Sequence, residues 1–124
     1  MNSSFTLLVR IVLGLILVVF GSNKLFHFIP LPPPIGPAAN FMSSLNATGY
    51  IFPLLGLLEI FIGAMLLFKK WVAFGLTLLV PISINILLFH LFLDIPGLVM
   101  ALLIGTLNGM LIYKHWRQYK ILFV

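Results

Sequence analysis

The chain has 124 residues, of which 62% are hydrophobic and only 7% are charged. A soluble domain is typically about 45–50% apolar and about 25% charged, so this composition excludes an ordinary soluble protein and indicates an integral membrane protein. The net charge of +5 comes from basic residues that flank apolar runs, which is typical of membrane topology signals and not of a nucleic-acid-binding surface. With no cysteine, the chain has no disulfide and no thiolate ligand of its own.

Four apolar runs predict four membrane-spanning helices. A spanning helix needs about 20 residues, and the runs cover about residues 5–25, 50–68, 71–93 and 95–113. No small-residue cleavage site follows the first run, so we expect a retained helix and not a secretory signal. We therefore predict one membrane domain over residues 1–124, with an all-α, polytopic fold: a four-transmembrane-helix bundle.

Basic residues predict how the bundle is oriented. Lys69 and Lys70 form the turn between the second and third helices, and Lys114, Arg117 and Lys120 follow the fourth. The positive-inside rule places both clusters in the cytoplasm. Because the number of spans is even, we expect the N-terminus there as well.

The connection over residues 27–49 is then the outer loop between the first two helices. Its Leu31-Pro-Pro-Pro34 run favours an extended conformation. After Pro37, apolar residues recur at helical spacing, at Ala38, Phe41, Met42 and Leu45. Either a short amphipathic helix lies on the outer leaflet, or an ordinary surface loop covers the end of the bundle.

An inner polar layer is expected where the first two helices meet. The stripes Arg10, Gly14, Leu17, Gly21, Lys24 and Gly56, Glu59, Gly63 each follow one helix face, and their glycines allow close packing. At ~1.5 Å per residue, Arg10 lies about 9 Å and Glu59 about 15 Å from the cytoplasmic ends of their helices, a difference that an arginine side chain spans. We predict a structural ion pair between Arg10 and Glu59, because a lone carboxylate at this depth is costly. A proton-handling site is the alternative. Asn108 falls in the same layer.

An outer polar layer is expected at the opposite ends of the helices. Lys24 from the first helix, and Asn85 and His90 from the third, lie at similar heights among several phenylalanines. A pocket with these donors and aromatic walls suits a quinone carbonyl or a lipid headgroup. The alternative is that aromatic residues mark the membrane interface, while His90 and Asp94 only end a helix. The histidines are too scattered to predict a metal site, and no catalytic residue is identified.

Small residues also recur in the fourth helix, at Ala101, Gly105, Asn108 and Gly109. This spacing predicts a close helix contact, either within the bundle or with a partner.

Several segments together resemble the DoxX family of small four-helix membrane proteins. They are Phe20-Gly-Ser-Asn-Lys24, Leu58-Glu-Ile60, Gly63-Ala-Met-Leu-Leu67 and Pro81-Ile-Ser-Ile-Asn85-Ile-Leu-Leu-Phe-His90. The resemblance implies a bundle in a bacterial cytoplasmic (inner) membrane and a link to quinone or thiol redox chemistry. It covers Arg10, Lys24, Glu59, Asn85 and His90 without assigning a catalytic role to any of them.

Three functions fit these observations. The chain is either an accessory subunit that packs against a larger membrane complex, a quinone-linked oxidoreductase component with a site at Lys24, Asn85 and His90, or a lipid or small-molecule binding or transport protein. The expected partners are membrane lipids together with another membrane protein or further copies of the chain. We prefer the accessory subunit, in which the polar layers fix the bundle. The sequence leaves the activity, if there is one, undetermined.

Overall fold

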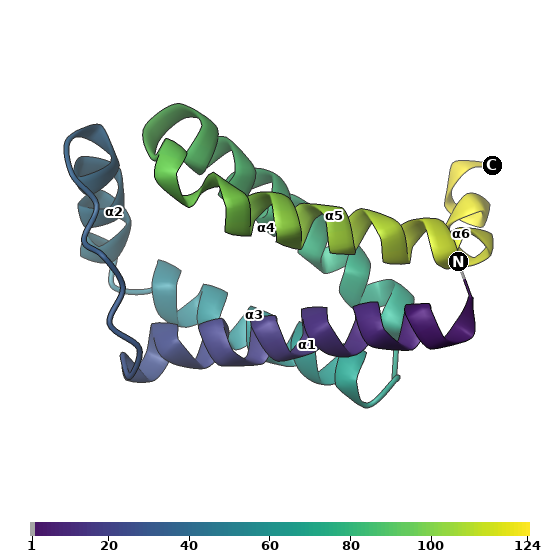
Figure 1. Ribbon diagram of the computed structural model, residues 1–124. Helices are drawn as coiled ribbons and strands as arrows, with labels where there is room; N and C mark the ends of the chain where they lie inside the picture. Colours follow the sequence, from purple (N-terminus) through teal and green to yellow (C-terminus); the bar gives the residue numbers. More distant parts are fainter. Residues whose placement is uncertain (1) are drawn as a thin grey trace.

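A computed structural model describes residues 2–124. The main helices are α1 (Ser3–Phe26), α2 (Pro37–Ala47), α3 (Ile51–Leu67), α4 (Val72–Leu93), α5 (Leu98–Lys114) and α6 (Trp116–Tyr119). Short 3₁₀ segments, Ile95–Gly97 and Lys120–Phe123, precede α5 and follow α6. The predicted all-α, polytopic membrane bundle is the architecture observed (Figure 1).

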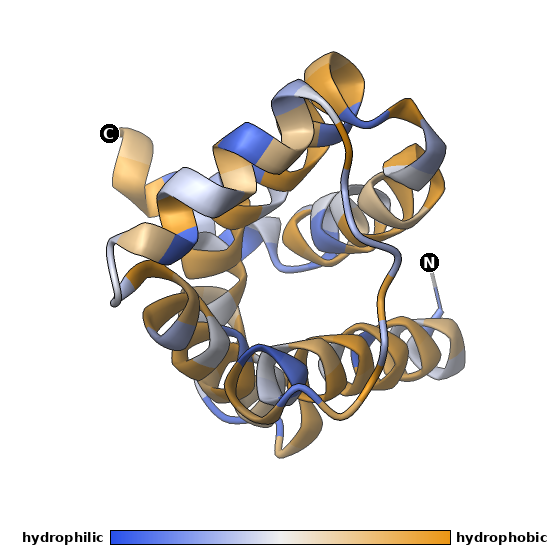
Figure 2. Cartoon of the chain, turned by 90° about the vertical axis from the view of Figure 1, so that its left-hand side faces the viewer, coloured by the Kyte–Doolittle hydropathy of each residue, from blue (hydrophilic) through white to orange (hydrophobic). Residues whose placement is uncertain are grey.

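Three segments are long and apolar enough to cross a membrane: Ser3–Phe26, Val72–Leu93 and Ile95–Lys114. α2 and α3 meet the same criterion together, although they are bent by 87° at the break between them. The described chain therefore has three candidate spans, or four when α2 and α3 count as one broken span. Figure 2 shows that apolar residues predominate along these helices.

The start and end of α1 are set by asparagine side chains. Asn2 caps the helix, because its Oδ1 accepts from the amide of Phe5 at 2.7 Å. At the other end, His27 turns into the left-handed region. The Asn23 side chain then accepts from the Ile29 amide at 2.7 Å and donates to the Ile29 carbonyl at 3.3 Å. These bonds hold the first residues of the outer connection against α1.

The amphipathic segment between α1 and α3 is a helix, α2, and not an ordinary surface loop. The proline-rich run before it is non-helical, and Pro37 occupies the first turn of α2, where its missing N–H costs nothing. Ala38 is buried, and the Phe41 ring lies 5.5 Å from the Phe89 ring of α4. α2 thus packs against the bundle end.

The four longest helices form two closely packed pairs, α1 with α3 and α4 with α5. Contacts of α3 with α4 and of α1 with α5 join the pairs. The core between them is aliphatic, and its fully buried large side chains are Leu13, Ile62, Leu66, Leu76, Leu79 and Leu111. Burial of these side chains from the four helices defines one core.

The chain termini and the α3–α4 turn lie at one end of the bundle, on the right in Figure 1. α2 and the α4–α5 connection lie at the other end. The first of these ends carries Lys69, Lys70, Lys114, Arg117 and Lys120, and we call it the basic end. Its cytoplasmic location remains a prediction.

Candidate functional site

The backbones of α1 and α3 touch at four glycines. A Cβ built on Gly21 would lie 2.8 Å from the Gly56 carbonyl oxygen, and one on Gly63 would lie 2.8 Å from the Gly14 carbonyl oxygen. Real Cβ atoms do not approach backbone this closely, so only glycine fits at these positions. The two glycine stripes predicted from the sequence lie on α1 and α3 and form a close interface, of the kind that small residues allow in membranes.

The α1–α3 interface contains a buried ion pair. Lys24 Nζ lies 2.9 Å from Glu59 Oε2, with side-chain exposures of 27% and 4% respectively. Side chains tilt toward the N-terminus of their own helix. Since α1 and α3 are antiparallel, Lys24 and Glu59 lean toward each other across an axial offset of roughly 9 Å.

The predicted pairing of Arg10 with Glu59 is wrong, because Lys24 takes that place. Arg10 Nη1 instead donates to the carbonyl oxygens of Leu66 and, at 3.5 Å, Leu67. These carbonyls end α3, where no further amide of the helix is available to them. The Arg10 side chain tilts away from Glu59, so it caps α3 and leaves the carboxylate to Lys24.

A second polar cluster joins α4 to α5. Asn108 Oδ1 accepts from the Ser83 hydroxyl at 3.2 Å, and its Nδ2 donates to the Leu76 carbonyl at 3.3 Å. All three groups are buried. Asn108 was expected in one layer with Glu59, but its hydrogen bonds go to α4, and it therefore fastens the second helix pair.

The three residues of the predicted outer pocket have separate partners. Lys24 binds Glu59, and Asn85 donates to the Pro81 carbonyl of its own helix at 2.9 Å. His90 Nδ1 lies 3.1 Å from the Asp94 carboxylate. None of Lys24, Asn85 and His90 therefore bonds to another of the three.

His90 instead packs at the α4–α5 connection. A Cβ on Gly97 would collide with its ring, so glycine makes room for the imidazole there. This arrangement agrees with the alternative that His90 and Asp94 end a helix.

The buried polar side chains of the described residues are all hydrogen-bonded. Within residues 2–124, every buried side-chain nitrogen or oxygen has a hydrogen-bond partner, and no three His, Asp or Glu residues are grouped as metal ligands. Most of the polar residues singled out by sequence thus bond to groups of the same chain.

One face of α5 is left open. A Cβ built on Gly105 or on Gly109 would meet no atom within 4 Å. Beside these glycines runs a groove of about 380 Å³, whose lining from α4 includes Ile84 and Leu87 and from α5 includes Leu102 and Thr106. The small residues of α5 are therefore not used up by contacts within the chain.

The glycine spacing held the information needed to find the correct ion pair. Matching Gly14 with Gly63 and Gly21 with Gly56 gives the antiparallel register. That register places Arg10 level with the end of α3, roughly 12 Å along the axis from Glu59. The predicted Arg10–Glu59 pair rested on depths measured from the end of each helix. Those depths are not comparable, because α1 extends beyond α3 at the basic end (Figure 1).

Comparison with protein families gives one result. The family model described as DoxX matches residues 5–91, which include α2, α3 and most of α1 and α4. No curated protein and no solved structure matches the chain. The match covers more than half of the chain and includes both helices of the Lys24–Glu59 ion pair, and it shows that the chain belongs to the DoxX family.

Proposed function

We propose that this DoxX-family membrane protein is a partner-binding subunit of a larger membrane assembly and that the open face of α5 is its contact surface. The observation that carries the proposal is the absence of any neighbour at Gly105 and Gly109. In membranes, glycine at a helix surface lets another backbone approach closely. The partner is another membrane protein or a second copy of this chain.

The groove beside the two glycines supports this proposal. Its polar members Ser83 and Asn108 bond to each other, so the surface offered to a partner is mainly apolar. Leu102 and Ile84 form exposed ridges beside the glycines. A partner helix with an aliphatic side chain opposite Gly105 fits this relief.

Asn85 gives weaker support from another face of the bundle. Its side chain is exposed within α4, and its amide is held only by the Pro81 carbonyl of the same helix. Exposed amides in spanning helices serve as hydrogen-bonding groups between helices. A second partner contact at Asn85 follows from this reasoning.

The internal polar groups agree with a non-catalytic role. The ion pair, the Arg10 cap and the Asn108 cluster each bond groups of the same chain. In this proposal, the link to quinone or thiol redox chemistry that the family resemblance implies belongs to the partner, and the present chain supplies an anchored binding surface.

The test is native mass spectrometry after gentle extraction from the source membrane. We expect the chain to carry a stoichiometric partner or a second copy. Gly105→Leu and Gly109→Leu should remove that partner while the melting temperature of the isolated chain stays unchanged. Leu103→Phe, which adds bulk at an exposed position of α5 outside the groove, is the matched control and should retain the partner.

Two results would contradict the proposal. If the Gly105→Leu and Gly109→Leu chains keep the partner, α5 is not the contact surface. If the wild-type particle is a monomer that carries a quinone-sized adduct, the protein binds its own small molecule and the subunit role fails.

A further inference from the structure

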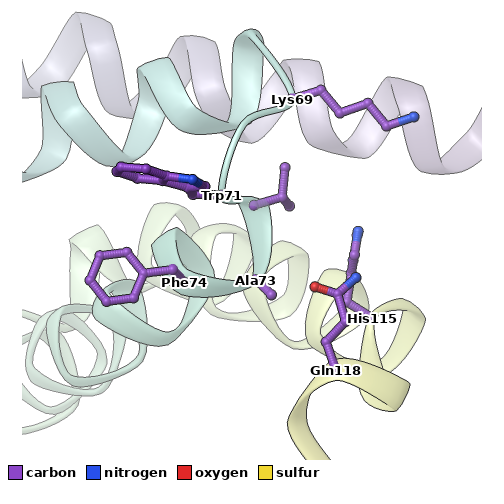
Figure 3. A pocket seen from close by; sticks show the side chains of 7 residues that line it. Lys69, Trp71, Ala73, Phe74, His115 and Gln118 are labelled. Atoms are coloured by element: carbon purple, nitrogen blue, oxygen red, sulfur yellow. The ribbon is translucent and has the colours of Figure 1, made fainter.

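An open pocket lies at the basic end of the bundle, away from the α5 groove. It has a volume of about 530 Å³ and is lined by Lys69, Trp71, Val72, Ala73, Phe74, His115 and Gln118. Figure 3 shows Lys69 above the pocket, Trp71 and Phe74 on one side, and His115 and Gln118 on the other. The α3–α4 turn, the first turn of α4 and the junction of α5 with α6 thus meet around one space.

We propose that this pocket binds the phosphate group of an anionic phospholipid. Lys69 supplies the main charge, the indole and the phenyl ring supply the lipid-facing wall, and His115 and Gln118 supply polar contacts. The site is independent of the α5 contact surface, so neither proposal depends on the other.

The charge around the pocket is of one sign. Five of the seven Lys and Arg residues lie at this end, and neither acidic side chain does. Glu59 is paired with Lys24 inside the bundle, and Asp94 lies beside His90 at the opposite end. Within the described chain, no carboxylate side chain neutralises Lys69, whose ammonium group is left to an external anion.

The lining also offers hydrogen-bond donors. The first backbone bond of α4 runs from the Gly75 amide to the Trp71 carbonyl, and no side chain caps the helix. The amides of Val72, Ala73 and Phe74 therefore have no acceptor within the helix. These amides add hydrogen-bond donors to the positive charge that Lys69 supplies at the cavity.

His115 is held in one orientation at the pocket. Its Nδ1 lies 2.9 Å from the Leu111 carbonyl oxygen, to which it donates. Nε2 is thereby left on the opposite side of the ring. In the imidazolium form, Nε2 is a second donor. Gln118 adds an amide donor from α6.

The surroundings of the pocket favour a lipid over a soluble phosphate. Trp71 is 76% exposed and Phe74 is 56% exposed, so the wall continues onto the lipid-facing surface of α4, where acyl chains run. Nearby, the exposed ring of Trp116 stacks on Phe123 at 5.8 Å. Tryptophan at a helix end is typical of the headgroup region, which is the level at which a phospholipid phosphate lies.

The turn also supplies a matched pair of lysines for the test. Lys69 lines the pocket, whereas the adjacent Lys70 does not. Lys69→Gln and Lys70→Gln therefore remove the same charge from the same turn. Because φ of Lys69 is 55°, a left-handed value that favours glycine, Lys69→Gly removes the charge and relieves the turn, so it should fold at least as well as the wild type.

The experiment titrates the purified full-length chain in detergent with phosphatidylglycerol and with phosphatidylcholine of the same acyl chains. Native mass spectrometry measures binding of the first lipid. We expect phosphatidylglycerol to bind more tightly, and Lys69→Gln or Lys69→Gly to weaken it roughly fivefold. Lys70→Gln should weaken it less than about twofold, because its charge acts only through the general surface potential. Inorganic phosphate is titrated separately as a competitor.

Three outcomes would overturn the proposal. Equal losses for Lys69→Gln and Lys70→Gln would show diffuse attraction without a site. Equal binding of the two lipids would exclude recognition of an anionic headgroup. Displacement of phosphatidylglycerol by millimolar inorganic phosphate would make a soluble phosphate the ligand.

Discussion

α1 and α5 each carry two glycines, but the two pairs have different surroundings. A Cβ on Gly21 would lie 2.8 Å from the Gly56 carbonyl oxygen and one on Gly14 would lie 2.9 Å from the Leu67 side chain, whereas a Cβ on Gly105 or Gly109 would meet nothing within 4 Å. The α1–α3 half also contains the buried ion pair, while neutral hydrogen bonds of Asn108 and Tyr119 help to hold the α4–α5 half. The same small-residue pattern therefore serves internal packing in one helix and leaves a surface available in another.

The largest expected effect comes from breaking the ion pair in the first half. Lys24→Met should lower the free energy of unfolding by about 3–5 kcal/mol, because the buried Glu59 carboxylate loses its counter-charge. Combining Lys24→Met with Glu59→Met should restore part of this loss. Denaturant unfolding in detergent measures both effects.

Arg10 supplies the control for this experiment. Combining Arg10→Met with Glu59→Met should show no such recovery, because Arg10 caps α3 and does not touch the carboxylate. Comparable recovery in the two double variants would contradict the pairing seen in the structure.

The next effect compares the two kinds of glycine directly. Gly63→Ala should destabilise the chain by about 1–3 kcal/mol, because the added methyl group forces α1 and α3 apart. Gly105→Ala should leave stability unchanged or raise it by up to about 1 kcal/mol, since alanine favours helix and finds open space. Thermal unfolding of the two isolated variants makes the comparison. Equal losses would show that the α5 face is packed within the chain after all.

A smaller effect is expected where α6 is fastened to α4. The Tyr119 hydroxyl donates to the Ala73 carbonyl at 2.6 Å, and Tyr119→Phe should cost about 0.5–1.5 kcal/mol. Thermal unfolding at neutral pH measures this loss. An unchanged melting temperature would mean that α6 contributes nothing to holding the second half.

The same contact predicts a pH dependence. Burial raises the pKa of Tyr119, and the Thr77 hydroxyl only partly opposes this. The folded chain therefore keeps the phenol proton longer than the unfolded chain, whose tyrosine titrates near pH ~10. The stability that this pKa difference contributes is fully present below pH ~10 and is lost as the pH rises through the raised pKa of the folded chain. Tyr119→Phe should remove this part of the loss of stability at high pH. If the wild type and Tyr119→Phe lose stability in parallel as the pH rises, the prediction is wrong.

The membrane class, the all-helical fold, the family and the close packing of α1 against α3 could all be predicted from the sequence. These features follow from composition, apolar run length and glycine spacing, which are local properties of the chain. The sequence also identified Arg10, Lys24 and Glu59 as residues in need of partners, because charges inside a membrane are costly whatever the fold.

Only the tertiary structure decided which partners these residues take. Lys24 pairs with Glu59 because antiparallel packing makes their side chains lean together, and Arg10 leans away to the carbonyls that end α3. Likewise, the spacing of Gly105 and Gly109 predicts a contact without saying with what. Glycine spacing indicates a register for α1 and α3, but the axial offset and tilt that the two helices adopt depend on how their whole surfaces fit.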